Sequence, residues 1–530
     1  NFSAGNYVIQ GDLTLDGNIS LVGAENNQTV LNISGDLIAT GVQLPADNLL
    51  PKINFISSGT QTLSIGAGNL RLSEIGVTNS STVKVEAPAP STITLGTANG
   101  GGLTIAEGST FELGPNNLVI QGAAAINGAN ETGQLAVNKS EISILSSGTQ
   151  LSNLYFKEES DTVKALHLNA HSTAQVTIRS RMYVDEQLDV QSGRVNAEGN
   201  VVLVSTENYT ARIPKIGTNG SILGGVEFQR AMGAVRAYRY MAAPVYNSTI
   251  ADWQGELRIT GPFPGNDNGQ SPSIYYWNEA QGGWVQFPGP NGSTASTFEL
   301  GRGYSVFQYD NVNNKKLRIT GPIHQGDFTY TNLSPSDETH AGWNLLGNVY
   351  ASPIRWGEEG WQRNDVMDMV AVRVNSGPQP GGVKYYIPST QTGDQDFAGV
   401  IAPGQSFWVR ASGSEPSIVV TEDAKVNEND ISFYRQRGPV NQLMVSLSRG
   451  QVQDKAYIHF GEESTDAIDA KFDAPKRSND YFNLSTVVDA KDFAINSMSL
   501  EFCQKSVPVN ITNVTAGSYK LAFEHIGAFE

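Results

Sequence analysis

Three pairs of neighbouring carboxylates are the residues in this sequence whose spacing first suggests chemistry. A glycosidase uses two carboxyl groups that face each other across about 5–10 Å. All three pairs lie in loop-like stretches, which favours a solvated surface and leaves a polysaccharide-cleaving site as the alternative. The pairs are Asp394 with Asp396, Glu358 with Glu359, and Asp365 with Asp368.

Acidic residues in Gly/Asn loops also suggest calcium. Such loops offer carboxylate and carbonyl oxygens, the ligands that Ca²⁺ prefers. The sequence contains neither an EF-hand loop nor a G-G-x-G-x-D repeat, so the calcium hypothesis rests on these loops, and we expect no other cofactor. The candidate ligands are Asp267, Asp310, Asp394 and Asp396.

Histidine and cysteine offer little further chemistry. His167 and His171 form an H-x-x-x-H pair, which on a helix would place both rings on one face for zinc. Their surroundings read as strand and turn and no Glu follows the first His, so exposed histidines are the favoured interpretation. Cys503 lies in a strand-like segment and is expected to be a small buried hydrophobe. With no G-x-S-x-G elbow and no P-loop, we expect a protein that is not an enzyme.

Aromatic residues give the remaining binding hypothesis. Tyr275, Tyr276 and Trp277 are followed closely by Trp284, and exposed aromatic rings can stack on sugars. The alternative is that the rings fill the core of a β domain. Tyr275, Trp277 and Trp284 are therefore the candidates for glycan stacking.

Composition excludes several classes of protein. Charged residues are 16% of the 530-residue chain, against about 25% in a typical soluble domain. The net charge of −17 argues against nucleic-acid binding, because basic patches are needed to neutralise phosphates. A single cysteine excludes an intrachain disulfide. No run approaches the roughly 18–20 apolar residues of a transmembrane helix. A neutral, glycine-rich chain of this kind favours β structure.

Residues 1–212 predict stacked β-coils. Short strand signals alternate with Gly, Asn and Asp turns, and only 15 charged residues occur in the first 150. The phrase GDLT at 11–14 returns as GDLI at 35–38, 24 residues later. A loose period in the low twenties is typical of a β-helix or β-solenoid. Because the repeat is degenerate, a β-sandwich with many short strands is the alternative.

Two further regions follow, and both read as β structure. Residues 213–428 are rich in aromatics and in Pro/Gly/Asn loops, and they contain all seven tryptophans. Residues 429–530 contain alternating strand signals that suit a β-sandwich. The predicted fold class is all-β, with N-terminal solenoid-like repeats followed by β-sandwich-type domains.

Three segments carry a family resemblance. Residues 342–356 read GWNLLGNVYASPIRW, 401–409 read IAPGQSFWV, and 468–476 read IDAKFDAPK. In this order and spacing they resemble the large secreted surface proteins of Bacteroidota that the type IX secretion system exports. The motif positions are Gly342, Trp343, Asn344, Gly347, Asn348, Pro403, Gly404 and Trp408.

The resemblance covers roughly residues 230–530. The chain departs from the usual GWNLxGNPYPSxIDW form at Val349, Ala351 and Arg355, where Pro, Pro and Asp are usual. The resemblance implies an extracellular or outer-surface destination and a translocon as partner in transit. It also implies a C-terminal sorting domain, so we expect further sequence beyond Glu530.

The start of the chain and one short motif add two expectations. The first five residues have no features of a signal peptide, so the chain reads as a mature or trimmed product. The tripeptide Asp161-Thr162-Val163 resembles the D-S/T-aliphatic O-glycan acceptor of Bacteroidota. Thr162 is therefore an expected O-glycosylation site.

The leading functional hypothesis is a non-enzymatic, secreted or cell-surface protein with a structural or adhesin-like role, whose candidate partners are a second copy of itself or surface glycans. In this hypothesis the solenoid is a stiff spacer, because each coil contacts only its neighbours. One alternative is a self-assembling filament or sheath subunit joined by strand pairing. The other is a polysaccharide-active enzyme or carbohydrate-binding module on a β-helix.

Overall fold

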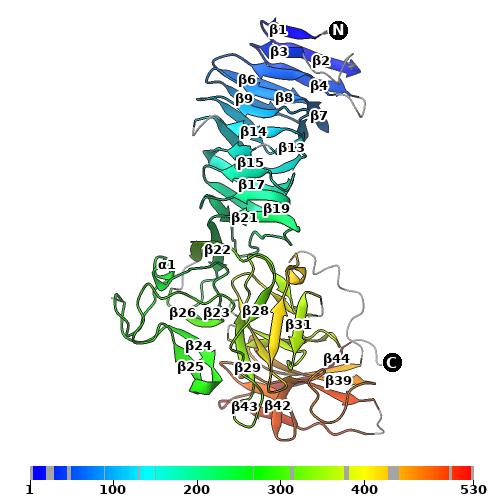
Figure 1. Cartoon of the computed structure of the whole chain (residues 1–530). Helices are drawn as coiled ribbons and strands as arrows, with labels where there is room; N and C mark the ends of the chain where they lie inside the picture. Colours follow the sequence, from blue (N-terminus) through cyan, green and yellow to red (C-terminus); the bar gives the residue numbers. More distant parts are fainter. Residues whose placement is uncertain are drawn as a thin grey trace. The chain divides into compact units, whose positions relative to one another are not determined.

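Nearly all regular structure in the chain is β-strand (Figure 1). Within the residues that the structure describes, the helical elements are α1 (Ile250–Gln254) and the 3₁₀ turns η2 (Glu279–Gln281) and η3 (Glu422–Ala424). None of these helices is long and apolar enough to cross a membrane. The expected all-β class is confirmed. The computed structural model describes residues 4–18, 29–44, 49–88, 90–128, 132–149, 151–266, 268–310, 315–357, 359–374, 381–394, 396–427, 441–500 and 504–526.

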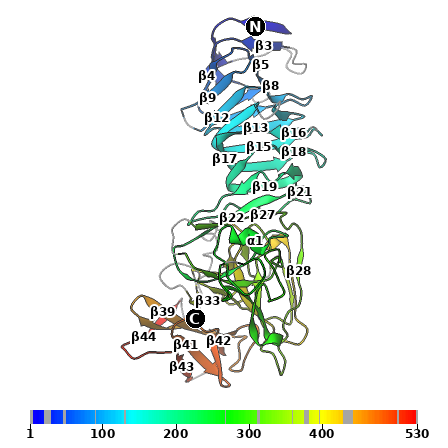
Figure 2. The same cartoon turned by 90° about the vertical axis from the view of Figure 1, so that its left-hand side faces the viewer.

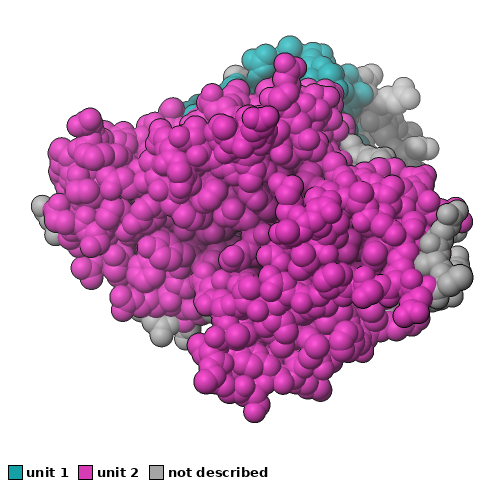
Figure 3. Space-filling model, turned by 90° about the horizontal axis from the view of Figure 1, so that it is seen from below, with its two compact units in different colours: residues 1–205, 210–229, 320–323 teal, residues 206–209, 230–319, 324–530 magenta. Residues whose placement is uncertain are grey.

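The chain divides into two compact units (Figure 3). Unit 1 consists of Asn1–Ser205, Thr210–Gln229 and Thr320–Ile323. Unit 2 consists of Thr206–Tyr209, Arg230–Ile319 and His324–Glu530. The domain boundaries expected after residues 212 and 428 remain predictions.

Unit 1 is a parallel β-solenoid of about eight turns (Figures 1 and 2). Its strands form three stacks, in which each strand pairs in parallel with the strands of the neighbouring turns. The first stack contains β1 (Gly5–Ile9), β3 (Thr29–Ile33), β5 (Lys52–Phe55), β8 (Glu74–Val77), β11 (Gly102–Ile105), β14 (Ala125–Gly128), β16 (Leu151–Leu154) and β18 (Gln175–Ile178).

The other two stacks begin as separate short strands and then share long ones. The second begins with β2 (Leu13–Asn18), β4 (Leu37–Gln43), β6 (Thr60–Ile65), β9 (Thr82–Glu86) and β12 (Thr110–Gly114). The third begins with β7 (Asn69–Leu72), β10 (Thr92–Leu95) and β13 (Asn117–Gly122). Both continue through β15 (Gln134–Ser146), β17 (Phe156–Asn169) and β19 (Met182–Asn196). The last strands wholly within unit 1 are β20 (Val201–Leu203) and β21 (Asn219–Leu223). The same sheet also contains β22 (Val226–Met232) and β27 (Lys315–Gly321), whose residues are divided between the two units.

Columns of identical register build the solenoid core. Ile53 aligns with Ile75, and Ile75 aligns with Leu103, and all three are fully buried. The sequence interval is 22 residues at the first step and 28 at the second, while the strand register is kept. Variable turns between constant strands therefore explain the degenerate repeat, and the solenoid rather than the sandwich alternative is confirmed for this region.

Unit 2 consists of smaller, mainly antiparallel sheets. A four-stranded sheet has the order β23 (Ala237–Met241), β26 (Tyr304–Gln308), β24 (Ile274–Asn278) and β25 (Gly283–Gln286). A five-stranded sheet has the order β29 (Trp343–Gly347), β36 (Ser406–Arg410), β32 (Val370–Arg373), β33 (Val383–Ile387) and β34 (Thr392–Gly393). Two small sheets contain β28 (Phe328–Tyr330), β37 (Ser417–Val420) and β31 (Trp361–Asn364), and β30 (Ile354–Arg355) with β35 (Val400–Ile401).

The last sheet of unit 2 lies at the C-terminal end of the chain. Its order is β43 (Val509–Thr512), β41 (Asn483–Val488), β42 (Lys491–Ser499), β39 (Val452–Gly461), β38 (Gln442–Arg449) and β44 (Lys520–Ile526), and β40 (Ala474–Pro475) pairs with β42. One face of this sheet packs on the five-stranded sheet, because Tyr457 and Ile495 share a buried cluster with Trp343 and Trp408.

Candidate functional site

One face of the four-stranded sheet in unit 2 is covered with aromatic rings. Successive side chains of a strand point to opposite faces, so Tyr238 and Tyr240 of β23 share a face. Directly opposed residues of antiparallel strands also share a face, and Ser305 of β26 lies opposite both Tyr240 and Tyr275. The small Ser305 side chain therefore separates two large rings, which leaves a hollow between them.

This hollow is an open pocket of about 310 Å³, called here the aromatic pocket. Tyr238 and Trp284 at its rim are 37% and 40% exposed, whereas Tyr240 is buried. The rings support each other, since Tyr240 lies 5.7 Å from Trp284 and Tyr238 lies 6.3 Å from Tyr275 between centroids. The pocket is lined by Tyr238, Tyr240, Tyr275, Trp284, Ser305, Arg373 and Asp480.

The polar side of the aromatic pocket is an ion pair. Both Nη atoms of Arg373 donate to the Asp480 carboxylate, with Nη1 2.9 Å from Oδ1. Arg373 is 5% exposed along its side chain and Asp480 is 56% exposed. Burial is the largest single influence and opposes the charge on Arg373, but hydrogen bonding and charge attraction to Asp480, together with Tyr240, outweigh it and raise the pKa of the guanidinium. Burial also raises the pKa of Tyr240, so the pocket presents a neutral hydroxyl beside a fixed charge pair.

Two of the three glycan-stacking candidates, Tyr275 and Trp284, line this pocket, and Trp277 does not. Trp277 is half-buried on the same face of the sheet, directly opposite Trp284, with its ring 5.4 Å from Trp408 and 5.3 Å from Trp284. The Arg477 guanidinium lies 4.6 Å from the Trp277 ring centroid. Trp277 therefore supports the pocket from the core.

The resemblance motif builds the surroundings of Arg477. The guanidinium carbon lies 4.0 Å from the Trp408 ring centroid and 5.0 Å from that of Trp343. Burial lowers the pKa of Arg477, and cation–π attraction to the rings offsets part of the cost of its charge. Gly342, which precedes Trp343, has φ +81 and leaves only 3.0 Å between a Cβ and Ala411. These motif positions thus hold the C-terminal sheet against the five-stranded sheet.

The remaining motif residues shape turns beside these strands. Asn348 is fully buried, and its Nδ2 donates to the carbonyl oxygen of Ser352 at 2.9 Å. Its Oδ1 accepts from the backbone N–H of Tyr350 at 3.0 Å. Asn344 Oδ1 accepts from the N–H of Ser334 at 2.7 Å. The other positions are Gly347, which forms the end of β29, and Pro403 and Gly404, which precede β36.

A second pocket of about 330 Å³, called here the carboxylate pocket, contains the Asp394 and Asp396 pair. Asp394 is buried: its Oδ1 accepts from the Tyr457 hydroxyl at 3.0 Å and its Oδ2 from the Tyr385 N–H at 3.0 Å. Burial is the main cause that raises the pKa of Asp394. Asp396 is exposed and pairs with Lys384 at 2.6 Å. The two neighbouring carboxyls therefore have different environments.

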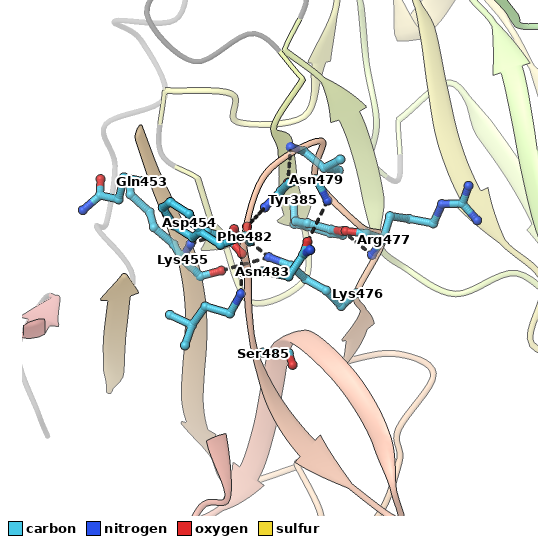
Figure 4. Close-up of polar contacts among 12 residues, drawn as sticks. Tyr385, Gln453, Asp454, Lys455, Lys476, Arg477, Asn479, Phe482, Asn483 and Ser485 are labelled. Carbon is cyan, nitrogen blue, oxygen red and sulfur yellow. Dashed lines mark hydrogen bonds and ion pairs between the residues drawn. The ribbon is translucent and has the colours of Figure 1, made fainter. Parts of the chain in front are cut away.

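A buried polar network reaches the carboxylate pocket through Asp454 (Figure 4). Asp454 Oδ1 accepts from Lys476 Nζ at 2.7 Å, and its Oδ2 accepts from the Leu484 N–H at 2.6 Å. Both side chains of this ion pair are about 5% exposed or less. The Tyr385 hydroxyl donates to the Arg477 carbonyl at 3.0 Å. The network joins β33 and β39 to the segment around Lys476.

The other carboxylate candidates have structural partners. Asp310 pairs with Lys315 at 3.2 Å. Asp365 accepts from the N–H of Glu415 at 3.2 Å, and Asp368 accepts from Arg363 at 3.0 Å. Across the described ranges, no group of three or more His, Cys, Asp or Glu residues is arranged to hold a metal. Calcium stays a prediction, and Asp267, Glu358 and Cys503 lie outside the described residues.

The histidine pair and Thr162 lie in unit 1. His167 Nδ1 is 3.3 Å from Asp189 Oδ2, and His171 Nδ1 is 2.9 Å from the Thr173 hydroxyl. Thr162 is half-buried within β17 and aligns with Asn138 and Tyr183 of the neighbouring turns. O-glycosylation at Thr162 stays a prediction.

Sequence reasoning missed most of the aromatic pocket. The alternation of Tyr238 and Tyr240 in one strand signal matches that of Tyr275 and Trp277. This pattern could have indicated that a second strand contributes aromatic rings to the same face. No local pattern joins Arg373 to Asp480, because 107 residues separate them.

The fold and pocket define a class: an all-β protein with a parallel solenoid unit and a second unit of antiparallel sheets that carries an aromatic pocket with an ion pair. Within that class the chain belongs to the family described as "Domain of unknown function (DUF8693)", which matches residues 133–530. The matched region contains both pockets and the later turns of the solenoid. No curated protein and no solved structure matches the chain.

Proposed function

We propose that this chain is a non-enzymatic, adhesin-like protein that binds carbohydrate in the aromatic pocket. The observation that carries the proposal is the convergence of Tyr275 and Trp284 with the Arg373–Asp480 pair around one hollow. The resemblance of residues 230–530 supports export by a type IX secretion system to the outer cell surface or the medium.

The chemistry of the aromatic pocket suits a sugar ring. The apolar C–H face of a sugar packs on exposed rings such as Trp284, while its hydroxyls need donors and acceptors. Asp480 supplies acceptor oxygens, and the guanidinium of Arg373 fixes their position. The volume is at the small end of the about 300–1,000 Å³ range of ligand pockets, which favours a terminal sugar or a short branch over a long chain.

The solenoid contributes a spacer in this proposal. Each turn pairs only with its neighbours, so stiffness accumulates along the stack. The buried columns contain mainly small aliphatics, which gives every turn a similar cross-section. A spacer of this kind would present a binding unit away from a cell surface.

A glycan panel tests the proposal directly. Immobilised neutral and acidic glycans are screened with the full chain, and the dissociation constant of the best one is measured by calorimetry. Trp284→Ala is expected to weaken binding about tenfold or more, because the stacking surface is lost. Tyr246→Ala is the matched control, since Tyr246 is 39% exposed and lies outside the pocket. Equal losses in both variants, or binding to no glycan, would contradict the proposal.

Polysaccharide cleavage is the second candidate, favoured by the two dissimilar carboxyls of the carboxylate pocket. A raised pKa suits Asp394 as a general acid, but both its oxygens are already engaged by Tyr457 and Tyr385. The test is release of reducing sugar ends from a polysaccharide panel. Activity that Asp394→Asn abolishes would replace the non-enzymatic proposal.

A further inference from the structure

Two large apolar side chains are exposed on β44, the last strand of the C-terminal sheet within the described residues. In the described part of the chain, β44 pairs with β38 and ends the strand order of its sheet. Phe523 lies opposite Val445, and Leu521 lies opposite Leu447. Val445 and Leu447 are buried, whereas Phe523 is 63% exposed and Leu521 is 43% exposed. The apolar face thus continues from the core to the edge, where two large side chains meet solvent.

We propose that β44 pairs antiparallel with β44 of a second copy of this chain, around a two-fold axis at Ala522. The strand runs Lys520, Leu521, Ala522, Phe523, Glu524, and it is self-complementary in this register. Leu521 then lies opposite Phe523 of the partner subunit. Lys520 lies opposite Glu524 of the partner subunit.

This register separates apolar and charged groups between the two faces. Side chains at positions 521 and 523 share one face of a strand, and those at 520, 522 and 524 share the other. The two-fold axis therefore gathers four apolar side chains on the face that already contains Val445 and Leu447. It places two opposite-charge pairs on the other face, and both kinds of cross-strand pair are stabilising.

Neighbouring registers lose this match. A two-fold axis at Phe523 would place Leu521 opposite His525 and Ala522 opposite Glu524 of the partner subunit. An axis at Leu521 would place Lys520 opposite Ala522 and leave Glu524 without a cation opposite it. Because only the Ala522 axis pairs both the charges and the large apolar groups, the sequence of β44 selects one register.

The pairing would form a closed dimer. A two-fold interface uses the same patch on both copies, so it satisfies both edges and stops growth. It would also join two exposed edges into one continuous sheet, which removes the aggregation hazard of a free edge strand. A filament would need a second, different contact.

A charge exchange tests the register. The mass of the full chain is measured by light scattering and sedimentation over a concentration series, and a dimer is expected for the unaltered chain. Lys520→Glu alone and Glu524→Lys alone each create two like-charge pairs and are expected to weaken the dimer about tenfold or more. The double variant Lys520→Glu/Glu524→Lys restores opposite charges and is expected to dimerise nearly as well as the original chain.

Crosslinking tests the two-fold axis independently. In a Cys503→Ser background, Ala522→Cys places two thiols opposite each other across antiparallel strands, within the range of about 4.4–6.8 Å between Cα atoms that a disulfide requires. Glu524→Cys is the control, because the two cysteines would lie four residues out of register. Rapid oxidation of the first variant and not of the second is expected.

Three outcomes would overturn the inference: a monomer at every concentration, a dimer that both single charge variants leave unchanged, or open-ended assembly. Glycan binding separates this inference from the proposed function. The residues of β44 do not line the aromatic pocket, so the charge variants are expected to bind glycan as the original chain does.

Discussion

The two units bury their side chains in different ways. Unit 1 buries aliphatic side chains in columns such as Ile53–Ile75–Leu103, which keep the same register from turn to turn. Unit 2 contains all seven tryptophans and buries charges among them, including Arg477 between the rings of Trp343 and Trp408. The first arrangement yields a uniform rod, and the second yields distinct local environments.

That difference explains where specific binding can arise. The buried column Ile53–Ile75–Leu103 repeats aliphatic side chains from turn to turn, so it offers no distinct arrangement of polar groups. In unit 2 the Arg373–Asp480 pair joins residues 107 positions apart and occurs at one place. Function that depends on a particular constellation is therefore expected in unit 2, and mechanical or spacing roles in unit 1.

The largest expected effect comes from removing the Trp408 ring, which tests whether the aromatic cluster stabilises unit 2. Trp408 is 1% exposed and contacts Trp277, Trp343 and Arg477. Trp408→Ala leaves a large cavity and removes a cation–π partner, so we expect a loss of about 4 kcal/mol in the free energy of unfolding of unit 2. Tryptophan fluorescence in denaturant reports this transition, because all seven tryptophans belong to unit 2.

The solenoid provides the control for this prediction. Leu103→Ala is expected to shift the far-UV circular dichroism transition while leaving the fluorescence transition in place. Trp408→Ala should shift the fluorescence transition of unit 2 and leave the solenoid part of the circular dichroism transition in place. If either variant shifts both transitions together, the two units unfold as one, and their stabilities cannot be compared separately.

A pH series tests the claim that unit 2 buries ionisable groups at a cost. Burial is the first cause that raises the pKa of Asp473 from 3.8 to about 6. At pH values below about 3 the carboxyl is protonated in both states and costs nothing. As pH rises to about 6 the unfolded chain ionises first, so this group lowers the free energy of unfolding by about 3 kcal/mol in total.

The measurement is the difference between Asp473→Asn and the original chain at each pH, followed by fluorescence. Relative to the original chain, the variant is expected to gain stability from pH 4 to pH 7. Asp466→Asn is the matched control, because hydrogen bonding to Lys505 lowers the pKa of Asp466 below its ordinary value. Its difference should therefore change mainly below pH 4, where the original chain loses the stabilisation as the carboxyl is protonated, and should be nearly constant from pH 5 to pH 7. A flat difference for Asp473→Asn would show that its carboxyl is not buried as described.

The fold of unit 1 could be predicted from its sequence because its information is local. Period-2 alternation and Gly or Asn turns recur along the chain, and GDLT at 11–14 and GDLI at 35–38 contribute to β2 and β4, which pair. The strand register could not be read from the sequence. Turns of different length make the interval between aligned residues vary, for example from 22 to 28 residues.

The candidate site was predictable only in part, for the same reason. Tyr275 and Trp284 stand out as aromatics near each other in sequence, and they do line the pocket. Trp277 shares a strand face with Tyr275 and lies opposite Trp284, so alternation along the strand does not separate it from them. Only the packing of its ring against Trp408 and Arg477 does. Arg373 and Asp480 meet only through the packing of the five-stranded sheet on the C-terminal sheet, and no spacing rule anticipates that.

A smaller effect tests whether solenoid turns are truly equivalent. Ile53 and Ile75 are fully buried on successive turns of one column. Ile→Val at each position removes one methylene and is expected to cost about 1 kcal/mol. The two losses should agree within roughly 0.5 kcal/mol when followed by circular dichroism. Clearly unequal costs would mean that each turn has its own environment, as in unit 2.

The smallest expected effect is the coupling of an exposed ion pair in unit 1, which is compared with a buried ion pair in unit 2. Lys52 of β5 and Glu74 of β8 join successive solenoid turns at 2.7 Å, with side chains 34% and 21% exposed. A double-mutant cycle with Lys52→Met and Glu74→Gln is expected to give a coupling of about 0.5 kcal/mol or less, because solvent screens the pair.

In unit 2, Asp454→Asn should cost several times more, since it leaves Lys476, which is 4% exposed, without its buried carboxylate. Raising the salt concentration should erase the solenoid coupling and leave the Asp454 effect nearly intact. If Asp454→Asn cost no more than the solenoid coupling, burial would not control the strength of these pairs.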